Sequence, residues 1–235
     1  MRTMTALAAL VLVAACGRPA EPPTKAPAVP PAGAGVETAA PSPDAPPAAS
    51  PGDAGGTADW RRVVSAEDAS RLGRLDQAWR LARAESEDKG FAAEVEALGP
   101  LVDPNAGLAG NLQPAPGDYR CRTIKLGSNG PDGLAYLEYP RFRCRVELTP
   151  GGDLVLTKTT GSQRTRGLLY PDTDRRLVFV GAQAWGADET GWPTYGQMAE
   201  RDQVGVFERI APGRWRLVLP WPRVDSKLEI LELVR

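Results

Sequence analysis

The chain has 235 residues, with 28 Lys and Arg against 29 Asp and Glu, and it contains no histidine. This charge balance argues against a nucleic-acid-binding protein, because such proteins normally carry a strong basic excess. The absence of histidine removes the commonest general base at neutral pH and the commonest metal ligand, which excludes zinc hydrolases and histidine-based catalytic triads.

Residues 1–15 predict an export signal. A positive charge at Arg2 precedes an apolar run that ends at Ala15 and is shorter than the roughly 20 residues of a membrane-spanning helix. Small residues stand directly before Cys16, as in the lipobox of bacterial lipoproteins. This resemblance implies cleavage after Ala15 and a diacylglyceryl thioether on Cys16. The alternative is an ordinary signal peptide with a chance cysteine.

A lipid on Cys16 predicts a protein anchored to a membrane of the cell envelope and facing the periplasm. Because no aspartate follows the cysteine to favour inner-membrane retention, the outer membrane is preferred. Residues 17–58 are rich in Pro, Ala and Gly and contain no aromatic residue, so they cannot bury enough apolar surface to fold. We therefore predict that residues 16–58 form a lipidated cysteine and a disordered tether, which averages roughly 35 Å end to end.

Residues 59–116 predict a helical hairpin followed by a linker. Ser65 is the expected N-cap, with Asp68 where a capping box usually has Glu. Apolar residues then recur at helical spacing until Lys89-Gly90 ends the first helix, and a shorter helix stops at Gly99-Pro100. The apolar stripe is Leu72, Leu75, Trp79 and Ala82. Such a stripe predicts a helix that covers the core, with a partner-binding helix as the alternative.

Residues 117–235 predict a mainly β domain, because short apolar runs alternate with clusters of Gly, Pro and Asp. Eight antiparallel strands are expected, at about 118–126, 140–148, 153–160, 165–170, 175–183, 204–210, 214–220 and 227–234. Eight meandering strands close into a small barrel, since closure removes the exposed edges. A two-sheet sandwich is the second choice.

Two cysteines besides Cys16 lie on predicted strands, namely Cys121 and Cys144. Alternation places Cys121 on the same strand face as Tyr119, and Cys144 on the same face as Val146, so both cysteines lie on apolar faces. The two strands are expected to be neighbours, and an exported protein reaches an oxidising compartment. We therefore predict a disulfide, with two free buried thiols as the alternative.

Several strings of residues resemble one bacterial family. Residues 117–127 read Gly-Asp-Tyr-Arg-Cys-Arg-Thr-Ile-Lys-Leu-Gly, and further matches lie at 142–145, 161–164, 170–172 and 214–220. In these strings the chain resembles domain of unknown function family 4893, over roughly residues 59–234. The resemblance implies a secreted protein or lipoprotein, and it implies no activity because none is assigned to the family.

The connections of a simple meander alternate between the two ends of the barrel. Tight turns are expected at one end, at 149–152, 171–174 and 211–213. Longer loops are expected at the other, at 127–139, 161–164, 184–203 and 221–226. Because function concentrates on long loops held by a rigid scaffold, the second end is the candidate functional end.

Aromatic and cationic residues gather at this end and form the candidate ligand-binding set: Tyr136, Trp185, Trp192, Tyr195, Trp221, Arg164 and Arg223. Such a set suits a ligand with an apolar body and an anionic head. The alternative is that these aromatics seal a barrel filled by its own side chains. An open, apolar-lined cavity at this end would favour the ligand.

Five arginines are expected on one outer face of the first two strands: Arg120, Arg122, Arg141, Arg143 and Arg145. Like charges that face each other across strands are unfavourable unless they are compensated. Ion pairs with acids such as Glu147 and Glu232 are the favoured compensation. An anionic partner such as a phosphorylated lipid surface is the other.

Catalysis is not expected. Two acidic pairs, Asp172 with Asp174 and Glu200 with Asp202, lie in loops, where acids are usually solvated or turn-forming. We therefore expect a binding or interaction protein that recognises an amphiphilic molecule or an envelope partner, without cofactor, metal or nucleic acid. A structural envelope protein with a filled barrel and a carboxylate-based hydrolase are the alternatives.

Overall fold

The computed structural model describes residues 59–235; the export signal, the lipidated Cys16 and the tether predicted for residues 1–58 lie outside the described residues. The helical segments are η1 (Trp60–Arg62), α1 (Ala66–Gly73), α2 (Leu75–Ser86), the π-helical turn η2 (Glu87–Phe91), α3 (Ala92–Ala97), η3 (Gly99–Leu101) and η4 (Ala199–Arg201). Within this part of the chain, every helix is too short or too polar to cross a membrane.

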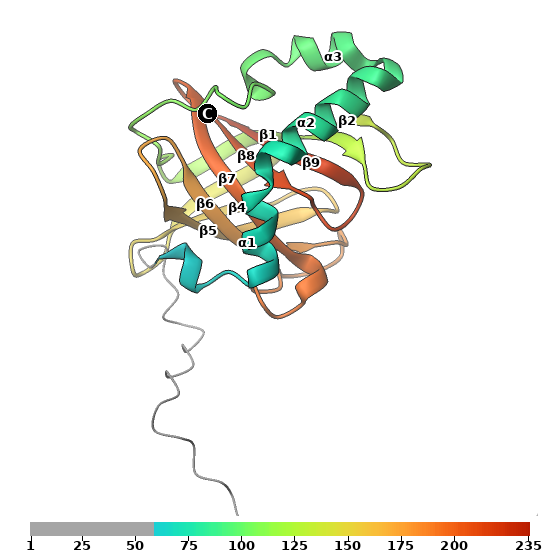
Figure 1. The fold of residues 1–235 in the computed structure, drawn as a ribbon. Coiled ribbons are helices and arrows are strands. Elements are labelled where there is room, and N and C mark those ends of the chain that lie inside the picture. The colour runs from blue at the N-terminus through green and yellow to red at the C-terminus, as the bar shows by residue number, and fades with distance from the viewer. Residues whose placement is uncertain (1–58) are drawn as a thin grey trace, which may run out of the picture. The chain divides into compact units, whose positions relative to one another are not determined.

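The strands are β1 (Gly117–Ser128), β2 (Tyr136–Glu138), β3 (Phe142–Leu148), β4 (Leu154–Lys158), β5 (Arg164–Pro171), β6 (Leu177–Ala184), β7 (Asp202–Ala211), β8 (Arg214–Pro220) and β9 (Ser226–Val234). They form one antiparallel sheet in the order β2-β1-β3-β4-β5-β6-β7-β8-β9, and β1 also pairs with β9. Eight strands therefore close a barrel, as predicted, and β2 is an addition (Figure 1).

The sequence did not predict β2. Both β2 and β3 pair with β1, β3 along its first residues and β2 along Ile124–Leu126. Between them, Tyr139 still donates its backbone N–H to the carbonyl oxygen of Thr123 at 2.9 Å. Pro140 follows and has no N–H to donate, so the strand is interrupted at this residue.

The first predicted helix is two helices. Ser65 is its N-cap, as predicted, and accepts a hydrogen bond on Oγ from the backbone N–H of Asp68 at 3.1 Å. The helix breaks at Arg74, where the backbone leaves helical values (φ −104°, ψ 21°). Gly90 then adopts a left-handed conformation (φ 95°), which glycine tolerates, and turns the chain into α3 as the Lys89-Gly90 pair indicated.

The middle of the barrel is filled by side chains. Gly167 and Gly181 are partners on β5 and β6, and a Cβ on either would lie within 2.7 Å of the tip of the Phe179 ring. Phe179 is fully buried and occupies the space that side chains at those positions would need. Small residues facing a large one are a common way to fill a barrel of eight strands.

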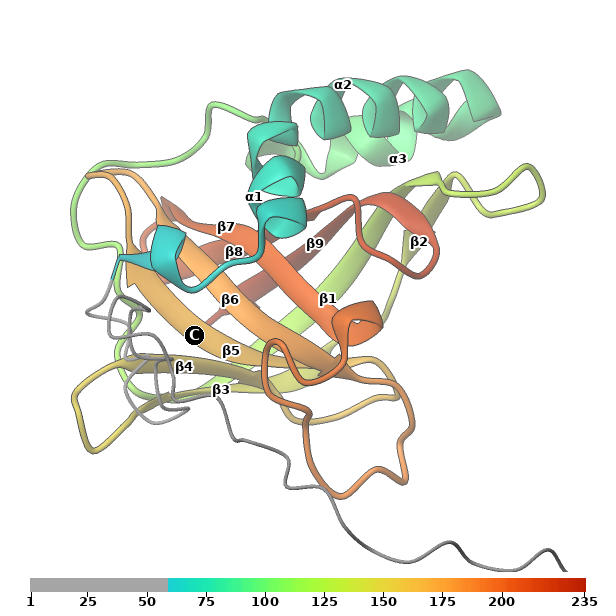
Figure 2. The ribbon, with the colours of Figure 1, turned by 60° about the horizontal axis from the view of Figure 1, so that its bottom comes forward.

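The helices cover two areas of the outer barrel wall. Residues of α2, α3 and η3 pack on β1, β8 and β9, where Trp79 and Val95 belong to the same buried cluster as Ile124 and Ile230. Residues of η1 and α1 pack on β5, β6 and β7. Figure 2 shows both layers from below the view of Figure 1. The apolar stripe of the helices thus covers the core, as predicted.

Candidate functional site

The structure places the longer loops together at one end of the barrel, as the meander predicts, and the inner wall changes character toward that end. Along β1 the inward-facing residues change from Cys121 to the polar Thr123 and Lys125. Along β4 they change from the apolar Leu156 to Lys158. We call the following residues the polar end of the interior: Thr123, Lys125, Lys158, Thr165, Gln183, Gln203 and Glu229. Each is at most 7% exposed, so every one of these polar groups needs a protein partner.

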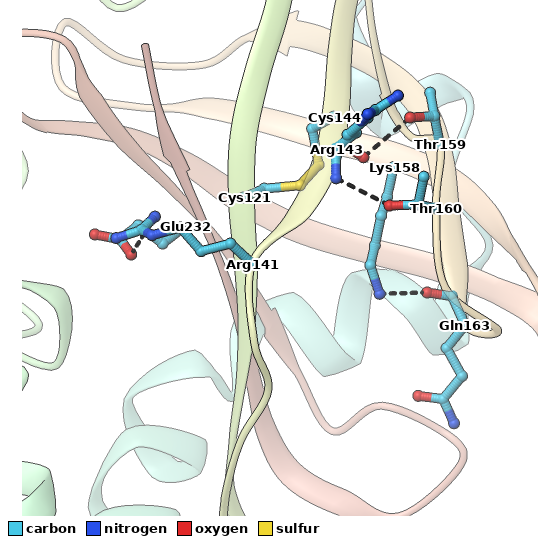
Figure 3. Close-up of a disulfide and its surroundings, with 9 residues drawn as sticks. All are labelled: Cys121, Arg141, Arg143, Cys144, Lys158, Thr159, Thr160, Gln163 and Glu232. Carbon is cyan, nitrogen blue, oxygen red and sulfur yellow. Dashed lines mark hydrogen bonds and ion pairs between the residues drawn. A yellow bond between two sulfur atoms is a disulfide. The ribbon is translucent and has the colours of Figure 1, made fainter.

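Gln163, in the loop between β4 and β5, connects the two lysines of this polar end. Lys125 Nζ donates to Gln163 Oε1 at 2.7 Å and lies 2.6 Å from a carboxylate oxygen of Asp225. Lys158 Nζ donates to the backbone oxygen of Gln163 at 2.8 Å, as Figure 3 shows. Glu229 lies 3.9 Å from Lys125. The polar end is therefore held closed by its own ion pairs and hydrogen bonds.

Burial shifts the pKa values of two groups in the polar end toward each other. It lowers the pKa of Lys158 to about 8, although the nearby Glu229 opposes the shift. It also raises the pKa of the Glu229 carboxyl, although Lys125 and Lys158 oppose this. Thr123 Oγ1 is buried without a hydrogen-bond partner among residues 59–235. Burial is therefore the main influence on the pKa values of Lys158 and Glu229, and the polar end is enclosed rather than open to solvent.

Lys158→Met is expected to remove a rise in stability with pH. Lysine loses its proton near pH 10.5 in the unfolded chain and near pH 8 in the folded protein. Between these values the unfolded chain binds more protons, so the free energy of unfolding rises by about 1 kcal/mol per pH unit. The difference in urea stability between wild type and variant at pH 8, 9 and 10 measures the effect.

Lys227→Met is the control for this measurement, because Lys227 pairs with Glu85 outside the polar end. The control variant is expected to keep the rise seen in the wild type. A constant difference between wild type and Lys158→Met from pH 8 to 10 would show that Lys158 titrates as it does in the unfolded chain.

A groove lies on the outer wall of β4, β5 and β6, where the loop between β6 and β7 folds back. Its volume is about 560 Å³. It is lined by apolar wall residues, two aromatic loop residues and one arginine, among them Val155, Leu168, Val180, Trp192, Tyr195 and Arg166. This combination of an apolar floor, an aromatic rim and a cation is typical of a small-molecule site. We call it the Trp192 groove.

Two arginines flank the ring of Trp192. The guanidinium carbons of Arg164 and Arg166 lie 5.1 and 5.6 Å from its centroid. Arg164 is engaged with the loop, because it donates to the backbone oxygens of Gly186 and Glu189. Arg166 is exposed and has no carboxylate partner in the described part of the chain, and the buried Trp192 Nε1 likewise has no acceptor there. The groove therefore offers the exposed guanidinium of Arg166 as a hydrogen-bond donor.

Tyr195 fixes the other side of the groove to α1. Its hydroxyl accepts a hydrogen bond from the backbone N–H of Ser65 at 2.9 Å and donates one to the Asp68 carboxylate. Burial and the Asp68 carboxylate raise the pKa of Tyr195 to about 12. The phenol therefore stays protonated at neutral pH and holds the loop against the helix.

A family model described as "Domain of unknown function (DUF4893)" matches residues 60–233. The chain belongs to this family. The match extends from η1 into β9, so the family covers the helical layer and the whole barrel. No curated protein and no solved structure matches the chain.

The DUF4893 barrel brings together only some of the candidate ligand-binding residues. Arg164, Trp192 and Tyr195 meet at the Trp192 groove, on the outer wall rather than around an open barrel mouth. Trp185 is 39% exposed in the same loop and packs against the guanidinium of Arg201 at 4.7 Å.

The other three candidate residues contact the helical layer. Tyr136 stacks on Phe91 with ring centroids 5.4 Å apart. Trp221 donates its indole N–H to the carbonyl oxygen of Arg74 at 3.2 Å. Arg223 forms ion pairs with acids of α1, the closer of them at 2.8 Å. These side chains attach the helices to the barrel of the DUF4893 fold.

Sequence reasoning missed Arg166 and the polar end. Lys125 and Lys158 follow inward-facing residues by two positions, so strand alternation carried a signal for both. Arg166 carried no signal, because its position depends on how the loop with Trp192 folds over β5.

The outer arginines of this DUF4893 chain are compensated largely as the favoured interpretation expected. The Glu232 carboxylate, 1% exposed, pairs with three arginines: Arg122, Arg141 and Arg214. Burial raises the pKa of Glu232, but the arginines outweigh it and hold the pKa below its usual value. Arg145 pairs with Asp118 at 2.9 Å and with Glu147 at 4.0 Å.

The two acidic pairs do not form a cleft. Asp172 accepts hydrogen bonds from Trp60 Nε1 at 2.9 Å and from Arg176 at 2.7 Å, and it anchors the turn after β5. Asp202 accepts from the backbone N–H of Gly196, whereas Asp174 and Glu200 are exposed. Between residues 59 and 235, no group of three or more Cys, Asp or Glu residues is arranged to hold a metal ion.

Proposed function

We propose that this chain is a lipid-anchored protein of the bacterial cell envelope, held through Cys16 and facing the periplasm. Its proposed task is to bind an amphiphilic molecule with an anionic head group, without catalysis. The lipobox-like residues before Cys16 and the disulfide between Cys121 and Cys144 support an exported protein. The outer membrane remains the preferred location.

The Trp192 groove is the observation that supports binding. Arg166 is an exposed cation without a carboxylate partner among the described residues, and an anionic head group would pair with it. Leu168 and Val180 would contact the apolar body of the ligand. The volume of about 560 Å³ lies within the range of small-molecule sites, about 300–1,000 Å³.

The filled interior changes where a ligand is expected. Phe179 fills the middle of the barrel, and the ion pairs of Lys125 close the polar end. This arrangement favours the filled-barrel alternative for the interior, so the proposal moves the ligand to the outer wall. A carboxylate-based hydrolase gains no support, because the acidic pairs serve turns and loops.

Dodecyl phosphate tests the proposal as a probe with an anionic head and an apolar chain. We expect calorimetric binding to the wild-type protein at monomeric probe concentrations. Trp192→Ala and Arg166→Gln are each expected to weaken it about tenfold, which corresponds to about 1.4 kcal/mol. Dodecyl maltoside, which has an uncharged head, is expected to bind more weakly than dodecyl phosphate.

Trp185→Ala is the matched control, because Trp185 lies on the same loop but does not line the groove. It is expected to leave the affinity unchanged. Equal losses in Trp185→Ala and Trp192→Ala, or equal affinity for the charged and uncharged probes, would contradict binding in the Trp192 groove.

A further inference from the structure

Two arginines of the outer face remain unpaired. Arg120 on β1 and Arg143 on β3 are direct cross-strand partners, and both side chains are exposed. Neither guanidinium forms an ion pair or a hydrogen bond with any residue from 59 to 235. In Figure 3 Arg141 lies beside Glu232, whereas Arg143 points away from that carboxylate. Two facing cations without compensation are unfavourable in a sheet.

These two arginines line an open groove. Its volume is about 590 Å³, and Tyr119, Thr159 and Val234 contribute to its walls. Its charged lining residues are four arginines and a single acid: Arg120, Arg143, Arg145, Arg235 and Asp118. Because Asp118 already pairs with Arg145, the uncompensated positive charge of the groove lies on Arg120, Arg143 and Arg235. We call it the arginine groove.

The chemistry of this groove selects phosphate. A guanidinium presents a planar set of donors that matches the oxygens of a phosphate group and binds it in a bidentate manner. Cross-strand partners have Cβ atoms about 4.5–5.5 Å apart, so one phosphate can contact both arginines. Val234 lines the same groove. The groove therefore suits a phosphate group.

We propose that the arginine groove docks the folded domain on a membrane by binding the phosphate groups of anionic phospholipids. The inference rests on the proposed lipid anchor, which would keep the domain near a bilayer through the tether predicted for residues 16–58. A basic residue near an anionic membrane surface contributes about fivefold in affinity, so two arginines give a selective but reversible contact. Docking would orient the tethered domain with its arginine groove facing the membrane to which Cys16 is anchored.

Vesicle co-sedimentation tests the docking. The full chain with Cys16→Ser, which cannot be acylated, is mixed with phosphatidylglycerol–phosphatidylcholine vesicles and, as the baseline, with phosphatidylcholine vesicles alone. We expect a preference for the anionic vesicles that weakens as salt is added. Arg120→Gln with Arg143→Gln is expected to reduce that preference at least tenfold.

Arg62→Gln with Arg80→Gln is the matched control, because both residues are exposed and neither forms an ion pair within residues 59–235. It removes the same charge from other surfaces and is expected to retain at least half of the preference. If the two double variants lost the same share of the preference for anionic vesicles, net charge alone would explain the binding and the proposal would be overturned.

Two further outcomes decide between the proposals. If inorganic phosphate raises the melting temperature of the wild type but not of Arg120→Gln/Arg143→Gln, while vesicles do not bind, the groove takes a soluble anion and membrane docking is overturned. Because dodecyl phosphate binding is measured through Trp192 and vesicle binding through Arg120 and Arg143, failure of one does not imply failure of the other. Loss of vesicle binding in Trp192→Ala alone would move the membrane contact to the other groove.

Discussion

Arg216→Met is expected to destabilise the folded protein by about 3–5 kcal/mol, because it leaves a buried charge network without its centre. The Arg216 side chain is fully buried, and its guanidinium pairs with Glu208 at 2.7 Å. It also donates to the backbone oxygens of Pro100, Leu101 and Asp103 at 2.7–3.0 Å. This one side chain therefore ties β8 to the segment that follows α3.

The cost arises mainly from the groups left behind. Methionine fills much of the volume of arginine, but the Leu101 oxygen would lose a buried donor and the Glu208 carboxylate would lose its ion-pair partner. Trp79, whose ring centroid is 5.2 Å from the Arg216 guanidinium carbon, would lose a contact with a cation. Arg216→Lys keeps the charge without the planar set of donors, so an intermediate loss is expected.

Urea unfolding followed by far-UV circular dichroism measures this loss. Arg209→Met is the matched control, since Arg209 also donates to two backbone oxygens, those of Ala109 and Gly110, but is partly exposed. Its expected cost is below about 1 kcal/mol, because water can replace the lost donor. If both variants lost the same stability, the buried network would contribute no more than a surface contact.

Arg216 also shows what the sequence could not predict. Along β8 it stands between Trp215 and Leu217, and alternation correctly places it on the outer face. An outward arginine on a strand is expected to be solvated, and only the position of the segment after α3 buries it. A side chain that becomes buried beneath a distant segment has no local pattern that would reveal it.

The strands were predictable because their signals are local. Turn residues mark each end, and the parity of Cys121 and Cys144 follows from alternation within two strands, so the barrel and the disulfide are both confirmed. The break at Arg74 was missed because the apolar spacing of the helices continues across it. There the backbone oxygen of Arg74 accepts the indole N–H of Trp221, a contact between residues distant in sequence.

The candidate site was predictable only in part. Loop length correctly indicated which end of the barrel carries the longer connections, since a meander fixes that alternation. It did not indicate which aromatics meet, and Tyr136 and Trp221 contact the helices instead of the Trp192 groove. Partners at the polar end, such as Asp225 for Lys125, were equally hidden because a loop supplies them.

Replacing both Cys121 and Cys144 by alanine is expected to lower the free energy of unfolding by about 3.5 kcal/mol. The two residues are 23 positions apart, and the entropy of closing a loop of that length in the unfolded chain gives this value. The bridge crosses the pairing of β1 with β3, which extends only from Gly117 to Cys121 before β1 continues beside β2. It therefore reinforces a short section of the barrel wall.

Because the disulfide is buried, its reduction in the folded protein and its effect on stability can be measured separately. Cys121 and Cys144 are at most 1% exposed, so a reductant added to the folded protein is expected to act only at the rate of opening. After equilibration with and without reductant, the two free energies of unfolding measured in urea for the wild type should differ by the full value of about 3.5 kcal/mol. The double alanine variant should show no difference, and Cys16→Ser should behave as the wild type.

Equal urea midpoints for the oxidised and the reduced wild type would show that the disulfide does not contribute to the stability of the barrel. A loss of the expected size would make the fold depend on an oxidising compartment, as the export signal before Cys16 predicts.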